Sequence, residues 1–144
     1  MLVRELMTAD VVTVGVDGTL DDAVEKLLEE GVGSVLVVDE GVPLGLITES
    51  DALEAAHDRG APLQAIGISD LAHPPLVTVD QERTVQSVAR TMAEEGVKKV
   101  VVTQELDVVG IVTLTDIVYH LADLQREAVG AAEEAADREW ETDD

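Results

Sequence analysis

The 144-residue chain contains no cysteine and no phenylalanine. Without cysteine it can form no disulfide, no thiolate metal site and no cysteine nucleophile. It also lacks any apolar run near the 18 residues that a membrane-spanning helix requires. The first ten residues, MLVRELMTAD, carry charge where a signal peptide would need its hydrophobic stretch. We therefore expect a soluble, cytoplasmic protein that makes no membrane contact.

Positive charge is also scarce. Lysine and arginine number 9 against 31 aspartate and glutamate residues, so the formal net charge is −22. Such a surface repels phosphate backbones, and nucleic acid is not expected as a partner. The aliphatic residues are ample for a core, which places the acidic residues on a folded surface. The size of the excess favours a chain adapted to high salt, where counterions screen the repulsion.

The chain contains one sequence unit twice, at an offset of 65 residues. The stretches PLGLITESDAL (43–53) and VVGIVTLTDIV (108–118) both carry the phrase Gly-x-x-Thr-x-x-Asp. No gap is needed to extend the match from Val3/Ile68 to Leu53/Val118. An in-register duplication of this length predicts two copies of one structural unit. The matched residues of the phrase are Gly45 with Gly110, Thr48 with Thr113 and Asp51 with Asp116.

Each unit predicts the order strand, helix, strand, strand, helix. Apolar residues in 20–28 and 85–93 recur at the spacing of one helical face. Two short runs rich in β-branched residues follow, as expected for covered strands. Gly31 and Gly96 fall just past the helices, where a left-handed residue ends the last turn. We predict an α/β (α+β) fold in which two βαββα units pack about an approximate twofold axis.

The same pattern suggests where the parts of the chain begin and end. We assign the first repeat to residues 1–58 and the second to residues 68–124. Between them, RGAPLQAIG (59–67) has the Pro and Gly of a linker. Residues 125–144 are expected to form an acidic C-terminal helix or tail.

Two interpretations of the repeated phrase stay open from the residues alone. Thr48 with Asp51, and Thr113 with Asp116, each place an acid three residues after a hydroxyl and ahead of an apolar helix, as in a capping box. The glycines would then only permit close strand packing. Alternatively, the turn offers backbone N–H groups to an anion, and the carboxylate accepts hydrogen bonds from sugar hydroxyls.

The chain resembles a tandem pair of CBS domains over residues 3 to about 121. The resemblance rests on the pattern LMTADVVTV…TLDDAV…EEGVGSVLVVD…PLGLITESDAL, which returns as LAHPPLVTV…TVQSVA…EEGVKKVVVT…VVGIVTLTDIV. It implies one disc-like module with two clefts that commonly bind adenine nucleotides or S-adenosylmethionine. It also implies that Asp51 and Asp116 hold ribose hydroxyls, and that Thr48 and Thr113 lie near phosphate. In such modules aliphatic and backbone groups hold the adenine, which suits a chain without Phe.

Lys98 and Lys99 stand side by side in a chain with only one other lysine. They could protect the edge of a strand and reach into solvent. The resemblance instead places them where members that bind nucleotides carry residues reaching phosphates. Their counterparts in the first repeat are the small residues Gly33 and Ser34, so the two clefts should differ. This charge favours AMP, ADP or ATP over the cationic S-adenosylmethionine.

Catalysis and metal binding have little support. His57 and His120 have no partner at metal-ligand spacing, and no nucleophile, base and orienting group occur together. His73, beside Pro74 and Pro75, is typical of a surface loop. We therefore expect no enzyme, no catalytic residue, no metal and no required cofactor.

The function we expect is that of a regulatory module that senses adenine nucleotide. The resemblance implies a homodimer, and an unidentified protein partner would receive the signal. Two alternatives remain: a scaffold whose clefts are empty and whose Thr and Asp residues only cap helices, and a module that binds S-adenosylmethionine.

Overall fold

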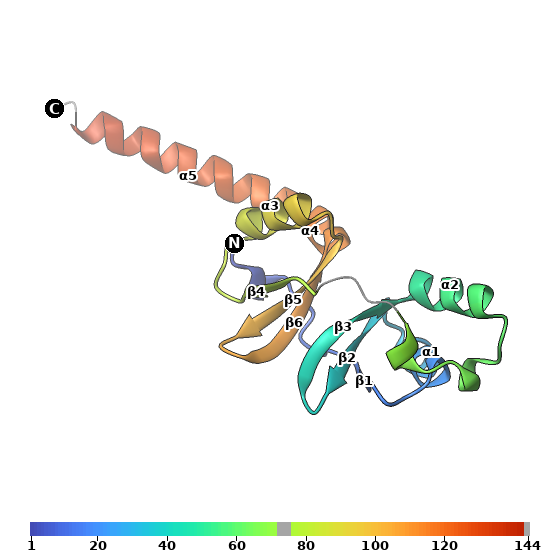
Figure 1. Ribbon diagram of the computed structural model, residues 1–144. Coiled ribbons are helices and arrows are strands. Elements are labelled where there is room, and N and C mark those ends of the chain that lie inside the picture. Colours follow the sequence, from blue (N-terminus) through green and yellow to red (C-terminus); the bar gives the residue numbers. More distant parts are fainter. Residues whose placement is uncertain (72–75, 143–144) are drawn as a thin grey trace. The chain divides into compact units, whose positions relative to one another are not determined.

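The computed structural model describes residues 1–71 and 76–142, with side chains to residue 135, and divides the chain into two compact units. Unit 2 comprises Ala9–Thr78, and unit 1 comprises Met1–Thr8 together with Val79–Asp144 (Figure 1). The expectations for His73, Pro74 and Pro75 lie outside the described residues.

Unit 2 contains the first copy of the predicted element order. Its sheet has the order β1-β2-β3, with β1 parallel to β2 and β2 antiparallel to β3. Helix α1 links the parallel pair, and α2 follows β3. The elements are β1 (Thr13–Gly15), α1 (Leu20–Glu30), β2 (Ser34–Asp39), β3 (Val42–Thr48), α2 (Glu49–Arg59), and the 3-10 helices η2 (Leu63–Ala65) and η3 (Ile68–Asp70).

Unit 1 repeats this order and adds a long C-terminal helix. Its sheet has the order β4-β5-β6, with β5 antiparallel to β6. The predicted fold class, an α/β fold with two βαββα repeats, is therefore confirmed. The elements are η1 (Val3–Glu5), β4 (Thr78–Asp80), α3 (Val85–Glu95), β5 (Lys99–Gln104), β6 (Asp107–Thr113), α4 (Leu114–Tyr119) and α5 (Leu121–Thr142).

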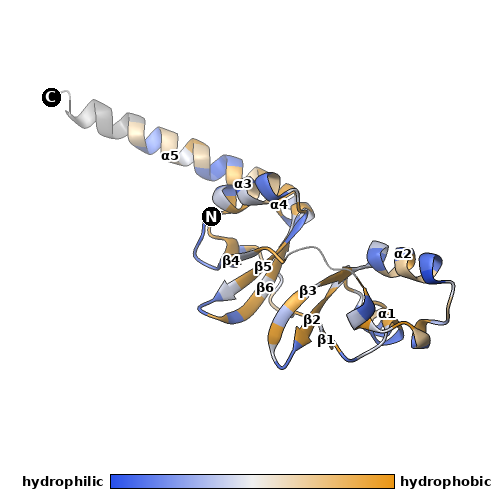
Figure 2. Cartoon of the chain, viewed as in Figure 1, coloured by the Kyte–Doolittle hydropathy of each residue, from blue (hydrophilic) through white to orange (hydrophobic). Residues whose placement is uncertain are grey.

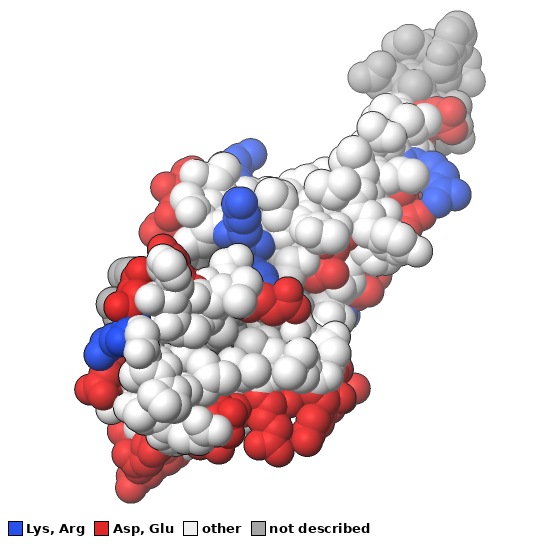
Figure 3. Space-filling model, turned by 90° about the vertical axis from the view of Figure 1, so that its right-hand side faces the viewer, with Lys and Arg blue, Asp and Glu red and all other residues white. Residues whose placement is uncertain are grey.

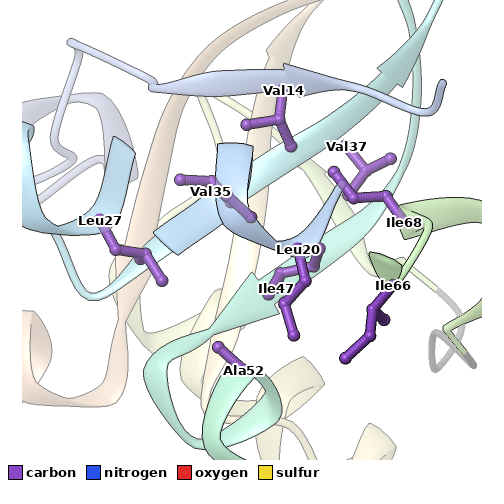
Figure 4. Close-up of a cluster of buried hydrophobic side chains, with 10 residues drawn as sticks. Val14, Leu20, Leu27, Val35, Val37, Ile47, Ala52, Ile66 and Ile68 are labelled. Carbon is purple, nitrogen blue, oxygen red and sulfur yellow. The ribbon is translucent and has the colours of Figure 1, made fainter. Parts of the chain in front are cut away.

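The core of unit 2 forms between the sheet and the apolar face of α1. Figure 4 shows Leu20 and Leu27 of α1 lying among Val35 and Val37 of β2 and Ile47 of β3. Alternate residues of β2 supply this core because successive side chains point to opposite faces of a sheet. Figure 2 shows the same concentration of apolar residues along the strands of both units.

Both α1 and α3 end as the sequence predicts. Gly31 and Gly96 follow them with φ of 62° and 67°. Only glycine adopts this left-handed conformation without a steric penalty.

Each repeat is completed by the segment that precedes the other repeat. In unit 1, the amide of Val3 donates to the carbonyl of Arg83 at 2.8 Å. In unit 2, the equivalent amide of Ile68 donates to the carbonyl of Gly18 at 3.0 Å. Both Val3 and Ile68 are fully buried. The compact units therefore differ from the sequence repeats, because the first eight residues belong with the second repeat.

The predicted linker, residues 59–67, is also structured. It contains η2 and contributes Ile66 to the core of unit 2. The carbonyl of Ile66 accepts from the amide of Leu20 at 2.8 Å, and so anchors the segment at the start of α1.

The acidic C-terminal region forms α5, a helix of 22 residues. No helix in residues 1–71 and 76–142 is both long and apolar enough to cross a membrane.

Candidate ligand-binding site

Four predicted site residues come together in unit 2 at the point where β2 begins and α2 begins. Ser34, the first residue of β2, pairs with Thr48, the last residue of β3. The carbonyl of Gly33 accepts from the amide of Glu49, the first residue of α2, at 3.2 Å. Asp51 lies in the first turn of that helix. We call Gly33, Ser34, Thr48 and Asp51 the first corner.

Unit 1 contains the equivalent arrangement, formed by Lys98, Lys99, Thr113 and Asp116. Lys99 pairs with Thr113 across β5 and β6. The carbonyl of Lys98 accepts from the amide of Leu114 at 2.8 Å. We call these four residues the second corner. Lys98 is exposed, so its ammonium group can reach a ligand in solvent.

Both Thr–Asp pairs form capping boxes. The amide of Thr48 donates to Oδ2 of Asp51 at 2.9 Å, and the amide of Asp51 donates to Oγ1 of Thr48 at 3.1 Å. The corresponding distances for Thr113 and Asp116 are 2.8 and 3.1 Å. The capping interpretation is therefore confirmed for both pairs. Thr19 and Asp22 form the same box at the start of α1, outside the corners.

Capping leaves each carboxylate with capacity for a further contact. In both boxes Oδ2 of the aspartate accepts the backbone bond. Within residues 1–71 and 76–135, no hydrogen bond to Oδ1 of Asp51 or Asp116 is formed. An ionised carboxylate has about four lone-pair sites, so one cap does not saturate it. A capping role and a ligand-binding role are therefore compatible in the same residue.

Asp51 borders a hollow of about 240 Å³ within unit 2. Glu54 and Asp58, three and seven residues after Asp51, also line it, as does Arg59. The Arg59 guanidinium donates to the carbonyl of Asp70 at 2.7 Å. The wall therefore has three carboxylates and one guanidinium, a balance that favours hydroxyl or cationic groups over phosphate. The sequence analysis did not identify Glu54 or Asp58, although their helical spacing from Asp51 was a usable signal.

The acidic wall belongs to a wider pattern on the molecule. On the face shown in Figure 3, Asp and Glu side chains form broad patches, and Lys and Arg occupy a few separate positions. Lys98 and Lys99 are therefore a local exception to the charge of the chain.

His120 has a carboxylate partner. Its Nδ1 lies 3.4 Å from Oδ2 of Asp123, which also accepts a hydrogen bond from Arg126. These bonds, that of His120 first, hold the pKa of the Asp123 carboxyl below its usual value of 3.8. Across the described part of the chain, no three His, Asp or Glu side chains are grouped closely enough to hold a metal ion.

Comparison with known proteins accounts for both repeats. The family profile for the CBS domain matches residues 3–58 and 68–123. The chain belongs to the CBS-domain family. The chain is 30% identical over 119 residues to Hypoxic response protein 1 of Mycobacterium tuberculosis, a match that covers 82% of this chain and 83% of that protein.

Two solved CBS structures are similar in fold. The hexameric CBS-CP12 protein from bloom-forming cyanobacteria is 26% identical, with a TM-score of 0.75 over 94% of this chain and 80% of that chain. The CBS domain pair of protein MJ0100, in complex with 5′-methylthioadenosine and S-adenosyl-L-methionine, is 23% identical, with a TM-score of 0.75 over 85% and 97%.

The extent of the matches bears on the question of catalysis. The chain spans only 33% to 60% of the length of the first curated relatives that it matches. In Hypoxic response protein 1, by contrast, the matched region fills most of the protein. Relatives of this second kind consist of a CBS pair without a catalytic domain, which confirms the expectation that the chain is not an enzyme.

Proposed function

We propose that the protein is a regulatory module that binds adenine nucleotide at the two corners and transmits the binding to a partner. The observation that carries the proposal is the duplicated corner itself, where a hydroxyl, a carboxylate and the start of a strand meet in both repeats. Membership of the CBS family supports it.

The contacts follow from the chemistry of the corners. Oδ1 of Asp51 and of Asp116 would accept hydrogen bonds from ribose hydroxyls, while Oδ2 keeps the helix cap. Thr48 and Thr113 would lie near the phosphate. Because each cap fixes its carboxylate, little side-chain entropy remains to be lost on binding.

Charge separates the two corners. Lys98 and Lys99 give the second corner two cationic groups for phosphate, whereas Gly33 and Ser34 give the first corner none. The second corner is therefore our choice for the phosphates of AMP, ADP or ATP. Ser34 is only 8% exposed, so a ligand would reach its hydroxyl only after a local opening.

A second candidate ligand is favoured by a separate observation. The hollow beside Asp51 has three carboxylates and one guanidinium, which suits the sulfonium of S-adenosylmethionine better than a phosphate. If that ligand occupies the first corner, the protein senses two classes of adenosyl compound.

The output is a shift in population. A ligand favours one conformation of the module only by as much as its affinities for the available conformations differ. A second copy or another protein then binds that conformation. We propose a cytoplasmic homodimer, and the hexameric state of the CBS-CP12 relative supports self-association. We further propose that salt stabilises the fold, because screening reduces the repulsion of a −22 chain.

A thermal-shift panel with AMP, ADP, ATP and S-adenosylmethionine in molar KCl tests the proposal. A ligand at one hundred times its dissociation constant adds about 2.7 kcal/mol of stability. We expect the nucleotides to raise the melting temperature, and Lys98→Ala with Lys99→Ala to reduce that rise. No shift with any nucleotide, or tighter binding of S-adenosylmethionine to the second corner, would contradict it.

A further inference from the structure

Helix α4 and the first residue of α5 expose four large apolar side chains, Leu114, Val118, Tyr119 and Leu121, which we call the α4 patch. Their exposed fractions lie between 45% and 84%. Leu114 and Val118 are four residues apart and share one side of α4, and Leu121 follows three residues later. The amide of His120 donates to the carbonyl of Asp116 at 3.2 Å, so the backbone stays helical between them.

The first repeat provides an internal comparison, because it has the same fold without this patch. The residues equivalent to Leu114, Val118 and Tyr119 are Glu49, Leu53 and Glu54 on α2. Both helices begin with the same capping box after the last strand of their repeat. Neither the cap nor the core therefore requires exposed apolar residues at positions 114 and 119, and folding alone does not explain the patch.

Charge indicates which surface can meet the patch. Between residues 108 and 122 the only acid is Asp116, which caps its own helix. A second copy with a charge of −22 can approach here without opposing carboxylates. On α2, the same approach would bring Glu49, Glu54 and Asp58 against their own copies, which costs free energy. A basic protein would instead be attracted to the acidic patches elsewhere.

We infer that the α4 patch is the docking surface for a second copy of this chain, which presents its own α4 patch across a twofold axis. A twofold contact places a surface against itself, and an apolar surface is complementary to itself, whereas an acidic one is not. The exposed apolar residues would be covered in the dimer, which a soluble protein favours. This inference concerns self-association and does not depend on nucleotide binding.

The absence of cysteine allows a direct test in the full-length chain. A single Val118→Cys variant can form a disulfide only with the same residue of another copy. We expect it to give covalent dimers under mild oxidation at micromolar concentration. Leu53→Cys, at the equivalent position of the first repeat and 74% exposed, is the matched control and should remain monomeric after oxidation.

A second measurement uses charge. In sedimentation equilibrium, Val118→Glu should raise the dimer dissociation constant at least about tenfold, and Leu53→Glu should leave it unchanged. A wild-type chain that stays monomeric, equal crosslinking of the two cysteine variants, or equal effects of the two glutamate variants would overturn the inference. Circular dichroism checks that Val118→Glu is folded, and if it is not, the cysteine pair decides. Nucleotide binding by a monomer would overturn this inference alone.

Discussion

A Cβ atom on Gly110 would lie 2.5 Å from Sδ of Met7 and 3.0 Å from the carbonyl oxygen of Thr8. The bridge between Thr8 and Ile111 holds the N-terminal segment against β6 at this point. The methionine end could move aside, but the backbone carbonyl is fixed by that pairing. The glycine of the second Gly-x-x-Thr-x-x-Asp phrase therefore permits a close approach of two backbones.

We predict that Gly110→Ala destabilises the protein by about 1–3 kcal/mol, because the added methyl group overpacks the contact with Met7 and Thr8. Urea unfolding measures this. Gly130→Ala is the control, since its Cβ would meet nothing within 4 Å in α5. It should gain up to about 1 kcal/mol from helix propensity. A Gly110→Ala variant as stable as the wild type would show that the segment does not lie against β6.

The exchange of segments between repeats gives a second prediction. Ile68 is fully buried in the core of unit 2, although the sequence assigns it to the second repeat. Ile68→Ala should cost about 2–5 kcal/mol in the free energy of unfolding. Leu106→Ala, at a position 94% exposed, should change it by no more than about 0.5 kcal/mol. Similar small effects at both positions would contradict the packing of residue 68.

Ser34 is a buried hydroxyl with no side-chain partner in the described part of the chain. A buried polar group without a hydrogen bond costs about 1–3 kcal/mol of desolvation. Ser34→Ala should therefore be neutral or stabilising by about 1 kcal/mol in thermal or urea unfolding. A loss of more than about 1 kcal/mol would mean that the hydroxyl is satisfied in the folded protein.

Asp123 gives a prediction on pH. Hydrogen bonds from His120 and Arg126 lower its pKa in the folded state below 3.8, so its ionised form stabilises the fold above that value. The contribution is lost as the pH falls through the folded pKa. Asp123→Asn should therefore flatten the acid limb of melting temperature against pH below about pH 4. An acid limb identical to that of the wild type would remove this contribution.

Much of the fold could be predicted from the sequence because its signals are local. Helical spacing around Leu20, the glycine after Glu30 and the offset of 65 residues together predict two βαββα repeats. The packing of Val3 on the second repeat could not be predicted, because periodicity does not reveal which neighbour a segment contacts. The same limit applied to the acidic wall near Asp51 and to the burial of Ser34, which depend on elements distant in sequence.

The predicted site is more evenly divided. The Thr–Asp pairs were identified from spacing, and their capping geometry is now seen. Whether the same aspartates bind ribose depends on their second oxygen atoms, which no sequence pattern describes.

Isothermal titration calorimetry of ATP in molar KCl, with wild type and three single variants, tests the central claim most directly. Asp51→Ala and Asp116→Ala each remove a cap and a corner, whereas Asp22→Ala removes the equivalent cap of α1 alone. All three should lose about 1 kcal/mol of stability. We predict that ATP binds the wild type and Asp22→Ala equally, and that affinity falls at least about tenfold in Asp116→Ala. Undetectable binding to the wild type, or equal affinity in Asp22→Ala, Asp51→Ala and Asp116→Ala, would contradict the account.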